Sequence, residues 1–210
     1  IIPQLAGVGG CNTELKYAVL SFSSGCKWIT SEPMIVEDNN SWKDLSANGI
    51  TDLGMAFEEL TSMLSRKKFL KSPSLSYAPV IFLMTDGYPT DNYKKGLEKL
   101  KNNNWYKYGM KIALGIGDYF DESVLEEFTE NKELVVKAAN SSQLAKLIKT
   151  IAVTSSQIAS KSMTIVSDEE NELDYEDVEG NKQKEMVKIV QDTVSDDEFI
   201  ETLELEDGWD

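Results

Sequence analysis

The sequence contains no histidine among its 210 residues. Histidine is the commonest general base of enzymes, and it completes the Ser-His and Cys-His pairs that activate nucleophiles. It is also a frequent ligand of zinc. The absence of histidine therefore removes those nucleophile pairs and most kinds of zinc site.

Cysteine is also scarce, because only Cys11 and Cys26 are present. They lie on either side of a predicted strand at 15–22, and eight extended residues span about 25 Å. A disulfide needs Cα atoms about 6 Å apart. Unless the flanking loops fold back, we expect both thiols to remain reduced, as in a cytoplasmic protein.

Long hydrophobic runs are missing as well. No apolar run approaches the roughly 20 residues of a membrane helix, and no secretory signal is present. We therefore expect no membrane association. The first residue is Ile1 rather than methionine, so we expect the sequence to be part of a longer or processed chain.

Positive charge is nearly absent from the last part of the chain. The net charge is −15, yet residues 1–165 contain 18 acidic and 18 basic residues, whereas 166–210 contain 18 acidic and 3 basic. Nucleic-acid binding needs clustered lysine and arginine, so we do not expect it. We predict one domain over 1–160, followed by an acidic, mostly disordered tail over 161–210.

Within the domain, short apolar runs alternate with helical patterns. Predicted strands cover 15–24, 27–30, 79–87, 111–117 and 133–138. Predicted helices cover 52–65, 92–103, 121–130 and 141–159. This alternation predicts an α/β fold: a Rossmann-like, doubly wound, mostly parallel sheet with helices on both faces.

Two oxygen-bearing side chains are expected at the ligand-binding edge of this sheet. In "VIFLMTDGYPTDN" (80–92), Asp86 directly follows a buried strand, and ligands bind beyond the carboxyl ends of such strands. Thr51 lies at a loop-to-helix junction that we expect at the same edge. A hydroxyl and a carboxylate are suitable ligands for a hard cation such as Mg²⁺.

Four segments resemble, in order, the successive motifs of von Willebrand factor A domains. They are "NGITDLGMAF", "VIFLMTDGYPTD", "KIALGIGD" and "LVVKAANSSQLAKLIKTI". The resemblance covers roughly residues 1–155 and is greatest to bacterial members associated with tellurium resistance. It implies a cytoplasmic protein-interaction module rather than an enzyme, with a role near stress, tellurium resistance or phage defence.

In that family a metal-ion-dependent adhesion site binds Mg²⁺ or Mn²⁺, and an acidic side chain of a protein partner completes the metal's ligand shell. Thr51 and Asp86 match two of its three ligand positions. The third, an Asp-x-Ser-x-Ser motif, does not occur in 1–210. "IIPQL" resembles the end of the helix that follows that motif, so we expect the first strand upstream of Ile1.

A chain without that central strand would expose two inner sheet edges. As supplied, the sequence therefore predicts half of the metal site. An alternative is that "MTIVSDEEN" (163–171) fills the vacant position as a permuted strand.

Simpler roles exist for the same residues. Thr51 could be only a helix N-cap, and Asp86 could only hold its turn through an Asx-type hydrogen bond. Thr90 and Asp91 are expected to start the next helix. Asp52 is expected to be a first-turn acid favoured by the helix dipole.

Two other functions remain open. The tail segment "DDEFIETLELEDGWD" (196–210) interleaves acids with apolar residues, so it is either a solvated tail or a docking motif anchored by Trp209 and Phe199. The protein would then be a metal-independent interaction domain. Alternatively, Asp86 is phosphorylated as in a signalling receiver, although no lysine is evident at the end of the later strand 111–117.

Overall fold

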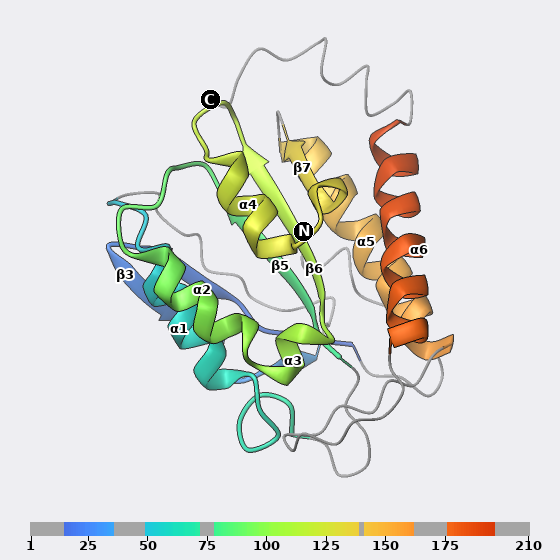
Figure 1. The fold of residues 1–210 in the computed structure, drawn as a ribbon, viewed down its shortest axis with the longest axis horizontal. Coiled ribbons are helices and arrows are strands. Elements are labelled where there is room, and N and C mark those ends of the chain that lie inside the picture. Colours follow the sequence, from blue (N-terminus) through green and yellow to red (C-terminus); the bar gives the residue numbers. More distant parts are fainter. Residues whose placement is uncertain (1–14, 36–48, 72–77, 139–140, 162–175, 196–210) are drawn as a thin grey trace.

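A parallel sheet forms the centre of the molecule. The computed structural model describes residues 15–35, 49–71, 78–138, 141–161 and 176–195. The sheet consists of β5 (Val80–Thr85), β6 (Met110–Ile116) and β7 (Val135–Ala138), in the order β5-β6-β7 (Figure 1). All three strands finish at the same end of the sheet. We call this end the carboxyl edge.

Helices cover both faces of the sheet. One face packs against α1 (Leu53–Met63), α2 (Tyr93–Lys101), α3 (Asn104–Lys107) and α4 (Glu122–Thr129). The other face packs against α5 (Ser141–Lys161) and α6 (Glu176–Val194). The predicted α/β architecture is thereby confirmed, and α3 is a helix that we did not predict.

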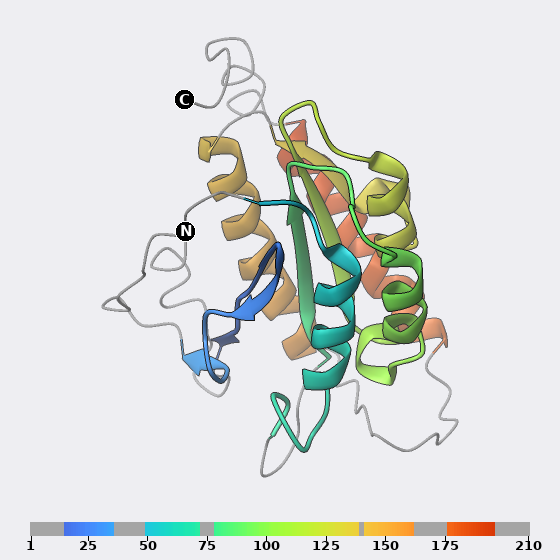
Figure 2. The ribbon, with the colours of Figure 1, turned by 90° about the vertical axis from the view of Figure 1, so that its left-hand side faces the viewer.

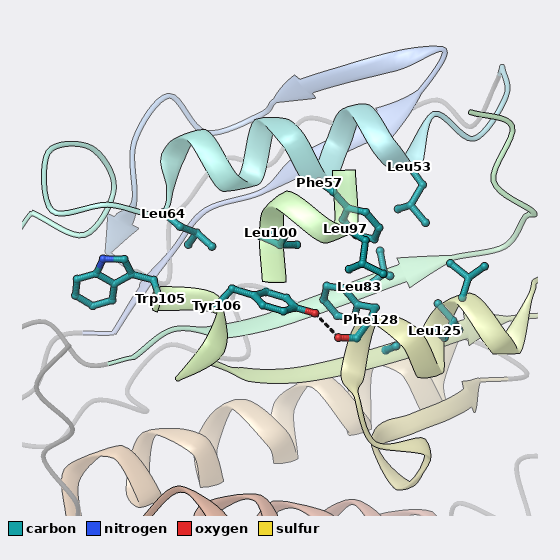
Figure 3. Close-up of a cluster of buried hydrophobic side chains, with 12 residues drawn as sticks. Leu53, Phe57, Leu64, Leu83, Leu97, Leu100, Trp105, Tyr106, Leu125 and Phe128 are labelled. Carbon is teal, nitrogen blue, oxygen red and sulfur yellow. Dashed lines mark hydrogen bonds between the residues drawn. The ribbon is translucent and has the colours of Figure 1, made fainter. Parts of the chain in front are cut away.

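Leucine and aromatic side chains fill the core between α1–α4 and the sheet (Figure 3). The ring of Phe128 stacks on Phe57 with centroids 5.7 Å apart and meets Tyr106 edge-on at 5.8 Å. The Tyr106 hydroxyl donates a hydrogen bond to the backbone carbonyl of Phe128. Burial, and to a smaller extent the charge of Glu130, raises the pKa of Tyr106 far above its ordinary range.

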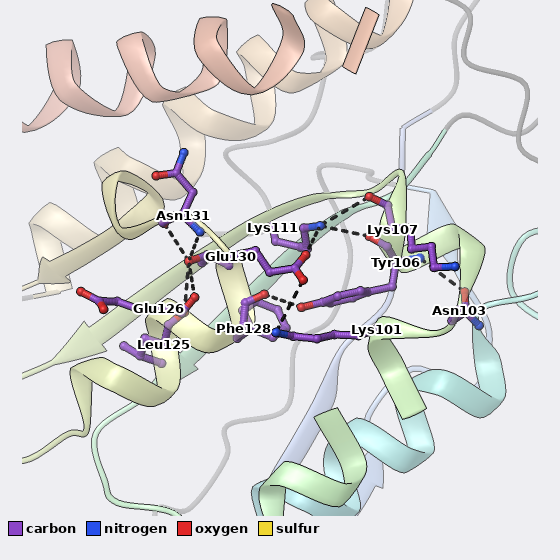
Figure 4. Close-up of polar contacts among 11 residues, drawn as sticks. Lys101, Asn103, Tyr106, Lys107, Lys111, Leu125, Glu126, Phe128, Glu130 and Asn131 are labelled. Atoms are coloured by element: carbon purple, nitrogen blue, oxygen red, sulfur yellow. Dashed lines mark hydrogen bonds and ion pairs between the residues drawn. The ribbon is translucent and has the colours of Figure 1, made fainter. Parts of the chain in front are cut away.

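A buried lysine lies at the opposite end of the sheet from the carboxyl edge (Figure 4). Lys111, the second residue of β6, is 3.2 Å from the carboxylate of Glu130 and donates to the carbonyls of Tyr106 and Lys107, each at 3.4 Å. Its ammonium group also lies 4.8 Å from the centroid of the Tyr106 ring. These partners satisfy the buried charge and join β6 to α3 and to the end of α4.

The second core lies between the sheet and α5 and α6. It includes Ile112 and Leu114 of β6, together with Met186 and Val190 of α6. Residues 161–210 were predicted to be mostly disordered, so α6 is a departure from that prediction. Met186, Val190 and Thr193 recur at helical spacing and are buried, but the many acids around them obscured this pattern.

The N-terminal strands form two separate small sheets. β2 (Leu20–Ser23) and β3 (Gly25–Trp28) make an antiparallel hairpin, whereas β1 (Lys16–Tyr17) pairs with β4 (Met34–Ile35). The predicted strand 15–24 is therefore divided. Figure 2 shows the hairpin beside the β5 side of the sheet.

Contacts to α1 hold the hairpin in place. The indole nitrogen of Trp28 donates to Glu59 at 2.8 Å, and Phe22 packs against the aromatic core. Among the described residues, the hairpin forms no ladder with β5.

Other sequence predictions meet the structure in part. Cys26 is a free thiol, while Cys11 and the segment 163–171 lie outside the described residues. Burial first, and then the charges of Glu59 and Asp52, raise the pKa of the Cys26 thiol. None of the helices in the described ranges is both long and apolar enough to cross a membrane.

Candidate functional site

Thr51 and the turn that contains Asp86 meet at the carboxyl edge. A Cβ atom on Gly87 would lie only 2.9 Å from the Thr51 hydroxyl oxygen. Such a contact is too short for a real Cβ, so a glycine is needed next to Asp86 to let the two segments approach. The fold thus brings together the two loops in which we predicted metal ligands.

Hydrogen bonds fix the relative positions of these two loops. The backbone nitrogen of Thr51 donates to the Thr90 hydroxyl at 3.1 Å, and the backbone nitrogen of Thr90 donates to the Thr51 carbonyl at 2.9 Å. The chain after β5 is therefore pinned to the chain before α1.

Asp91 caps α1 rather than starting α2. Its carboxylate accepts from the backbone nitrogens of Gly54 at 2.9 Å and Met55 at 3.0 Å, both in the first turn of α1. The side chain of Asn92 caps α2 instead. The expectation for Asp91 was therefore wrong, because the fold brings a second loop to the start of α1.

Asp52 occupies the N-cap position of α1, but its side chain makes no capping bond there. It accepts from the backbone nitrogen of Gly25 at 2.7 Å and from the Thr90 hydroxyl at 3.3 Å. Asp52 therefore holds the turn of the hairpin. Because position 52 is the N-cap, Thr51 is not the capping residue of this helix.

The turn at Asp86 is held by its neighbour. The Thr85 hydroxyl accepts from the backbone nitrogen of Gly87 and donates to its carbonyl, both at 3.3 Å. Within the described ranges, neither the exposed Asp86 carboxylate nor the Thr51 hydroxyl takes part in a hydrogen bond or ion pair. The simpler Asx-turn role for Asp86 is therefore absent from this arrangement.

The donor chemistry at this edge fits a hard cation in part. Thr51 and Asp86 both offer oxygen, which suits Mg²⁺ or Mn²⁺. However, the described residues contain no group of three or more His, Cys, Asp or Glu side chains that could hold a metal. Two oxygen donors are fewer than the roughly six that Mg²⁺ takes, so further ligands would have to come from elsewhere.

Large hydrophobic side chains surround the same edge, and the sequence patterns did not indicate them. Ile50, Met55, Tyr88 and Tyr119 are 53%, 51%, 57% and 78% exposed. They lie in the loops or first turn at the ends of β5 and β6 and at the start of α1. Periodicity detects buried faces, whereas isolated apolar residues in loops give no periodic signal.

A lysine at this edge revises one argument about the receiver alternative. Lys137, the third residue of β7, forms an ion pair with Asp118, which follows β6. We had found no lysine near the end of a later strand. Lys137 occupies such a position, although its ammonium group is paired with Asp118.

Comparisons with known proteins agree with this fold. No protein-family model matches the sequence, and no curated protein matches it. Among solved structures, the chain is similar to a von Willebrand factor type A protein from Catenulispora acidiphila. The TM-score is 0.53 with 12% identity, over 73% of this chain and 36% of that one.

A second similar structure is proximal thread matrix protein 1 from the mussel byssus, described with a zinc occupied MIDAS motif. Its TM-score is 0.48 with 22% identity, over 68% of this chain and 36% of that one. This chain thus spans little more than a third of either protein. At 12% identity the similarity to the Catenulispora acidiphila protein shows the fold alone, which is that of a von Willebrand factor A-like domain.

Some predictions are not reached by these findings. Neither similar structure indicates tellurium resistance or a cytoplasmic location. Phe199 and Trp209 lie outside the described residues. These assignments remain predictions.

Proposed function

We propose that this protein is a protein-interaction module whose carboxyl edge binds Mg²⁺ or Mn²⁺, with Thr51 and Asp86 among the ligands. The observation that carries the proposal is that some side chains at this edge form hydrogen bonds and others do not. Asp52, Thr90 and Asp91 are engaged in hydrogen bonds that hold the loops, whereas the side-chain oxygens of Thr51 and Asp86 have no described partner.

The partner in this proposal is a protein that presents an acidic side chain. A bound divalent cation would supply a Lewis-acidic position for such a carboxylate. In the family that the sequence resembles, the remaining protein ligands come from an Asp-x-Ser-x-Ser motif, which residues 1–210 do not contain. The role of the chain's own residues is to hold two oxygens on a rigid edge and not to catalyse a reaction.

The hydrophobic residues around the site support docking of a protein. Tyrosine and methionine are enriched at protein interfaces, and aromatic residues often carry much of the binding energy. Tyr88, Tyr119 and Met55 would contact the partner around its acidic residue. A cytoplasmic role in stress response, tellurium resistance or defence is part of this proposal.

A metal-independent module is the second candidate, because the described residues offer only part of a metal site. In that case the tail 196–210 would bind the partner, with Trp209 and Phe199 as anchors. A phosphorylated Asp86 is the remaining alternative, and labelling by acetyl phosphate would identify it.

Calorimetric titration with Mg²⁺ and with Mn²⁺ tests the proposal. The wild-type protein is compared with Asp86→Asn, Thr51→Val and a matched control, Asp118→Asn, which changes another exposed carboxylate at the same edge. We expect Asp86→Asn to weaken metal binding at least about tenfold, which corresponds to about 1.4 kcal/mol. Thr51→Val should weaken it less, and Asp118→Asn should bind as the wild type does.

Equal heats from the wild type and Asp86→Asn would end the metal hypothesis. Circular dichroism of each variant establishes that the fold is retained. Binding to a protein partner that survives EDTA but is lost on deletion of 196–210 would favour the second candidate.

A further inference from the structure

The hydroxyl of Thr90 bonds to the two residues before α1, although Thr90 itself lies just before α2. It accepts a hydrogen bond from the backbone nitrogen of Thr51 at 3.1 Å and donates one to the carboxylate of Asp52 at 3.3 Å. These partners lie 39 and 38 residues earlier in the chain. α2 is capped by Asn92 instead. The expectation that Thr90 starts α2 was therefore wrong, and its side chain holds the loop of Thr51.

The direction of both bonds is fixed. A threonine hydroxyl has one hydrogen, and Asp52 takes it because a carboxylate only accepts. The Thr90 oxygen is thereby left to accept from the Thr51 amide. The second carboxylate oxygen of Asp52 accepts from the backbone nitrogen of Gly25 at 2.7 Å. The Thr90 hydroxyl is thus oriented by Asp52 on one side and holds Thr51 on the other.

Two main-chain bonds hold the rest of this segment. The backbone nitrogen of Asp52 donates to the Ser23 carbonyl, and that of Thr90 donates to the Thr51 carbonyl, both at 2.9 Å. Neither bond needs a particular side chain at position 90. Replacing the Thr90 hydroxyl by a methyl group therefore frees the Thr51 amide, while the charge and the main-chain bonds of this edge stay the same.

The Thr51 side chain lies directly against the turn that follows β5. A Cβ atom on Gly87 would be 2.9 Å from the Thr51 hydroxyl oxygen and 4.0 Å from the Thr51 Cβ. Within the described ranges that hydroxyl forms no hydrogen bond of its own, so its place beside the Asp86 turn depends on how its backbone is held. The bond from the Thr51 amide to the Thr90 hydroxyl is part of that hold.

We propose that Thr90 is a positioning residue of the candidate metal site. Its hydroxyl fixes the Thr51 backbone against the Asp86 turn, so that the side-chain oxygens of Thr51 and Asp86 serve the same cation. Thr90 acts through Thr51 and is not itself a ligand, because its hydroxyl is engaged by Thr51 and Asp52. The role toward the cation rests on the proposed function, whereas the fixing of Thr51 does not.

Nuclear magnetic resonance of the isotope-labelled full chain, in EDTA, tests the fixing of Thr51. Thr90→Val removes the hydroxyl and Thr90→Ser retains it, while the control Thr61→Val makes the same change at a hydroxyl that bonds within α1. We expect the Thr51 and Gly87 amide resonances to shift in Thr90→Val. Because Thr90 is exposed and water competes for its bonds, the Thr51 amide should exchange only about threefold faster. Thr90→Ser and Thr61→Val should stay close to the wild type.

Calorimetric titration with Mn²⁺ tests the role toward the cation. Thr90→Val should weaken Mn²⁺ binding about fivefold, and Thr90→Ser less than about twofold. In the Thr51→Val background, Thr90→Val should cause no further loss, because the residue through which it acts has already lost its hydroxyl. A role in stability alone would leave Mn²⁺ affinity unchanged in the folded protein. Circular dichroism establishes that each variant is folded.

The two measurements separate this proposal from the proposed function. Unchanged Thr51 and Gly87 resonances in Thr90→Val would overturn the positioning role, as would Mn²⁺ binding equal to that of a wild type that binds the ion. Additive losses in the double variant would overturn it too, because Thr90 would then act independently of Thr51. A wild type that binds no Mn²⁺ would instead overturn the proposed function, and the resonances in EDTA would still decide whether Thr90 fixes Thr51.

Discussion

The two sides of the central sheet are built very differently. We call β6, β7, α5 and α6 the closed side, and β5 with the β2–β3 hairpin the open side. On the closed side, Leu114, Leu147 and Ile151 are fully buried, whereas Met84 on the open side is 39% exposed. The strands on both sides are similarly apolar, and β7 has a single described neighbour just as β5 does. The difference therefore arises from how far α5 and α6 cover each strand. We therefore expect stability to be concentrated on the closed side.

The largest expected effect compares two residues that face each other across this boundary. Leu114→Ala should lower the free energy of unfolding by about 3 kcal/mol, because it leaves a cavity in a closed core. Met84→Ala, at the opposite position on β5, should cost less than about 1 kcal/mol because its side chain already meets solvent. Urea unfolding of the two variants measures both values.

An equal loss of unfolding free energy in Leu114→Ala and Met84→Ala would contradict the difference between the closed and open sides. It would mean that β5 is as well covered as β6.

The next effect concerns the aromatic core. Tyr106→Phe should cost about 1–2 kcal/mol, since it leaves the buried Phe128 carbonyl without its donor. Burial raises the pKa of Tyr106, so the folded state retains its proton when the unfolded state, with a pKa of about 10, has lost it. Stability is therefore full below pH 10 and falls as the pH rises above it.

Urea unfolding at pH 9 and at pH 11 checks this dependence. The wild type should lose more stability between these values than Tyr106→Phe does. The same loss in both proteins would assign the alkaline sensitivity to other groups.

A smaller effect on the free energy of unfolding is expected in the loop 86–92, which follows β5. Asp91→Ala should cost about 1 kcal/mol, because two backbone nitrogens of α1 lose their acceptor. Asp86→Ala, in the same loop, should change the free energy of unfolding by less than about 0.5 kcal/mol. Thermal and urea unfolding in EDTA compare the two, and a larger loss from Asp86→Ala would assign Asp86 a structural role.

The smallest effect is expected at the surface of the closed side. Lys137 and Asp118 form an ion pair, but their side chains are 55% and 79% exposed. Lys137→Met should change the free energy of unfolding by less than about 0.5 kcal/mol, because solvent screens such pairs. A double-mutant cycle with Asp118→Asn measures the coupling, and a value well above this limit would show that charge as well as burial stabilises this side.

Much of the fold could be predicted from periodicity. The buried strands 79–87 and 111–117 and the helices 52–65, 92–103 and 121–130 all occur with small shifts in their ends. Their apolar residues repeat at strand or helix spacing, and Asp86 directly follows a strand. The sequence was therefore sufficient to place Asp86 and Thr51 at one edge.

The parts that could not be predicted depend on contacts between distant segments. Asp91 caps a helix that lies earlier in the chain, and nothing near position 91 indicates that partner. Met186 is buried because α6 packs with α5. The acidic residues near it in the sequence hid the apolar helical pattern. Whether a strand edge is open depends likewise on what lies beside it, which composition does not encode.

Two glycines let α1 and α2 pack closely. A Cβ on Gly96 would lie 2.4 Å from the Gly54 carbonyl oxygen, and a Cβ on Gly54 would lie 2.8 Å from the Asn92 carbonyl oxygen. The helices thus touch backbone to backbone, without side chains between them that could change rotamer. We expect the two helices to shift together, and a movement of the 86–92 loop on ligand binding to reach the turn of the hairpin through Asp52, which bonds both Thr90 and Gly25.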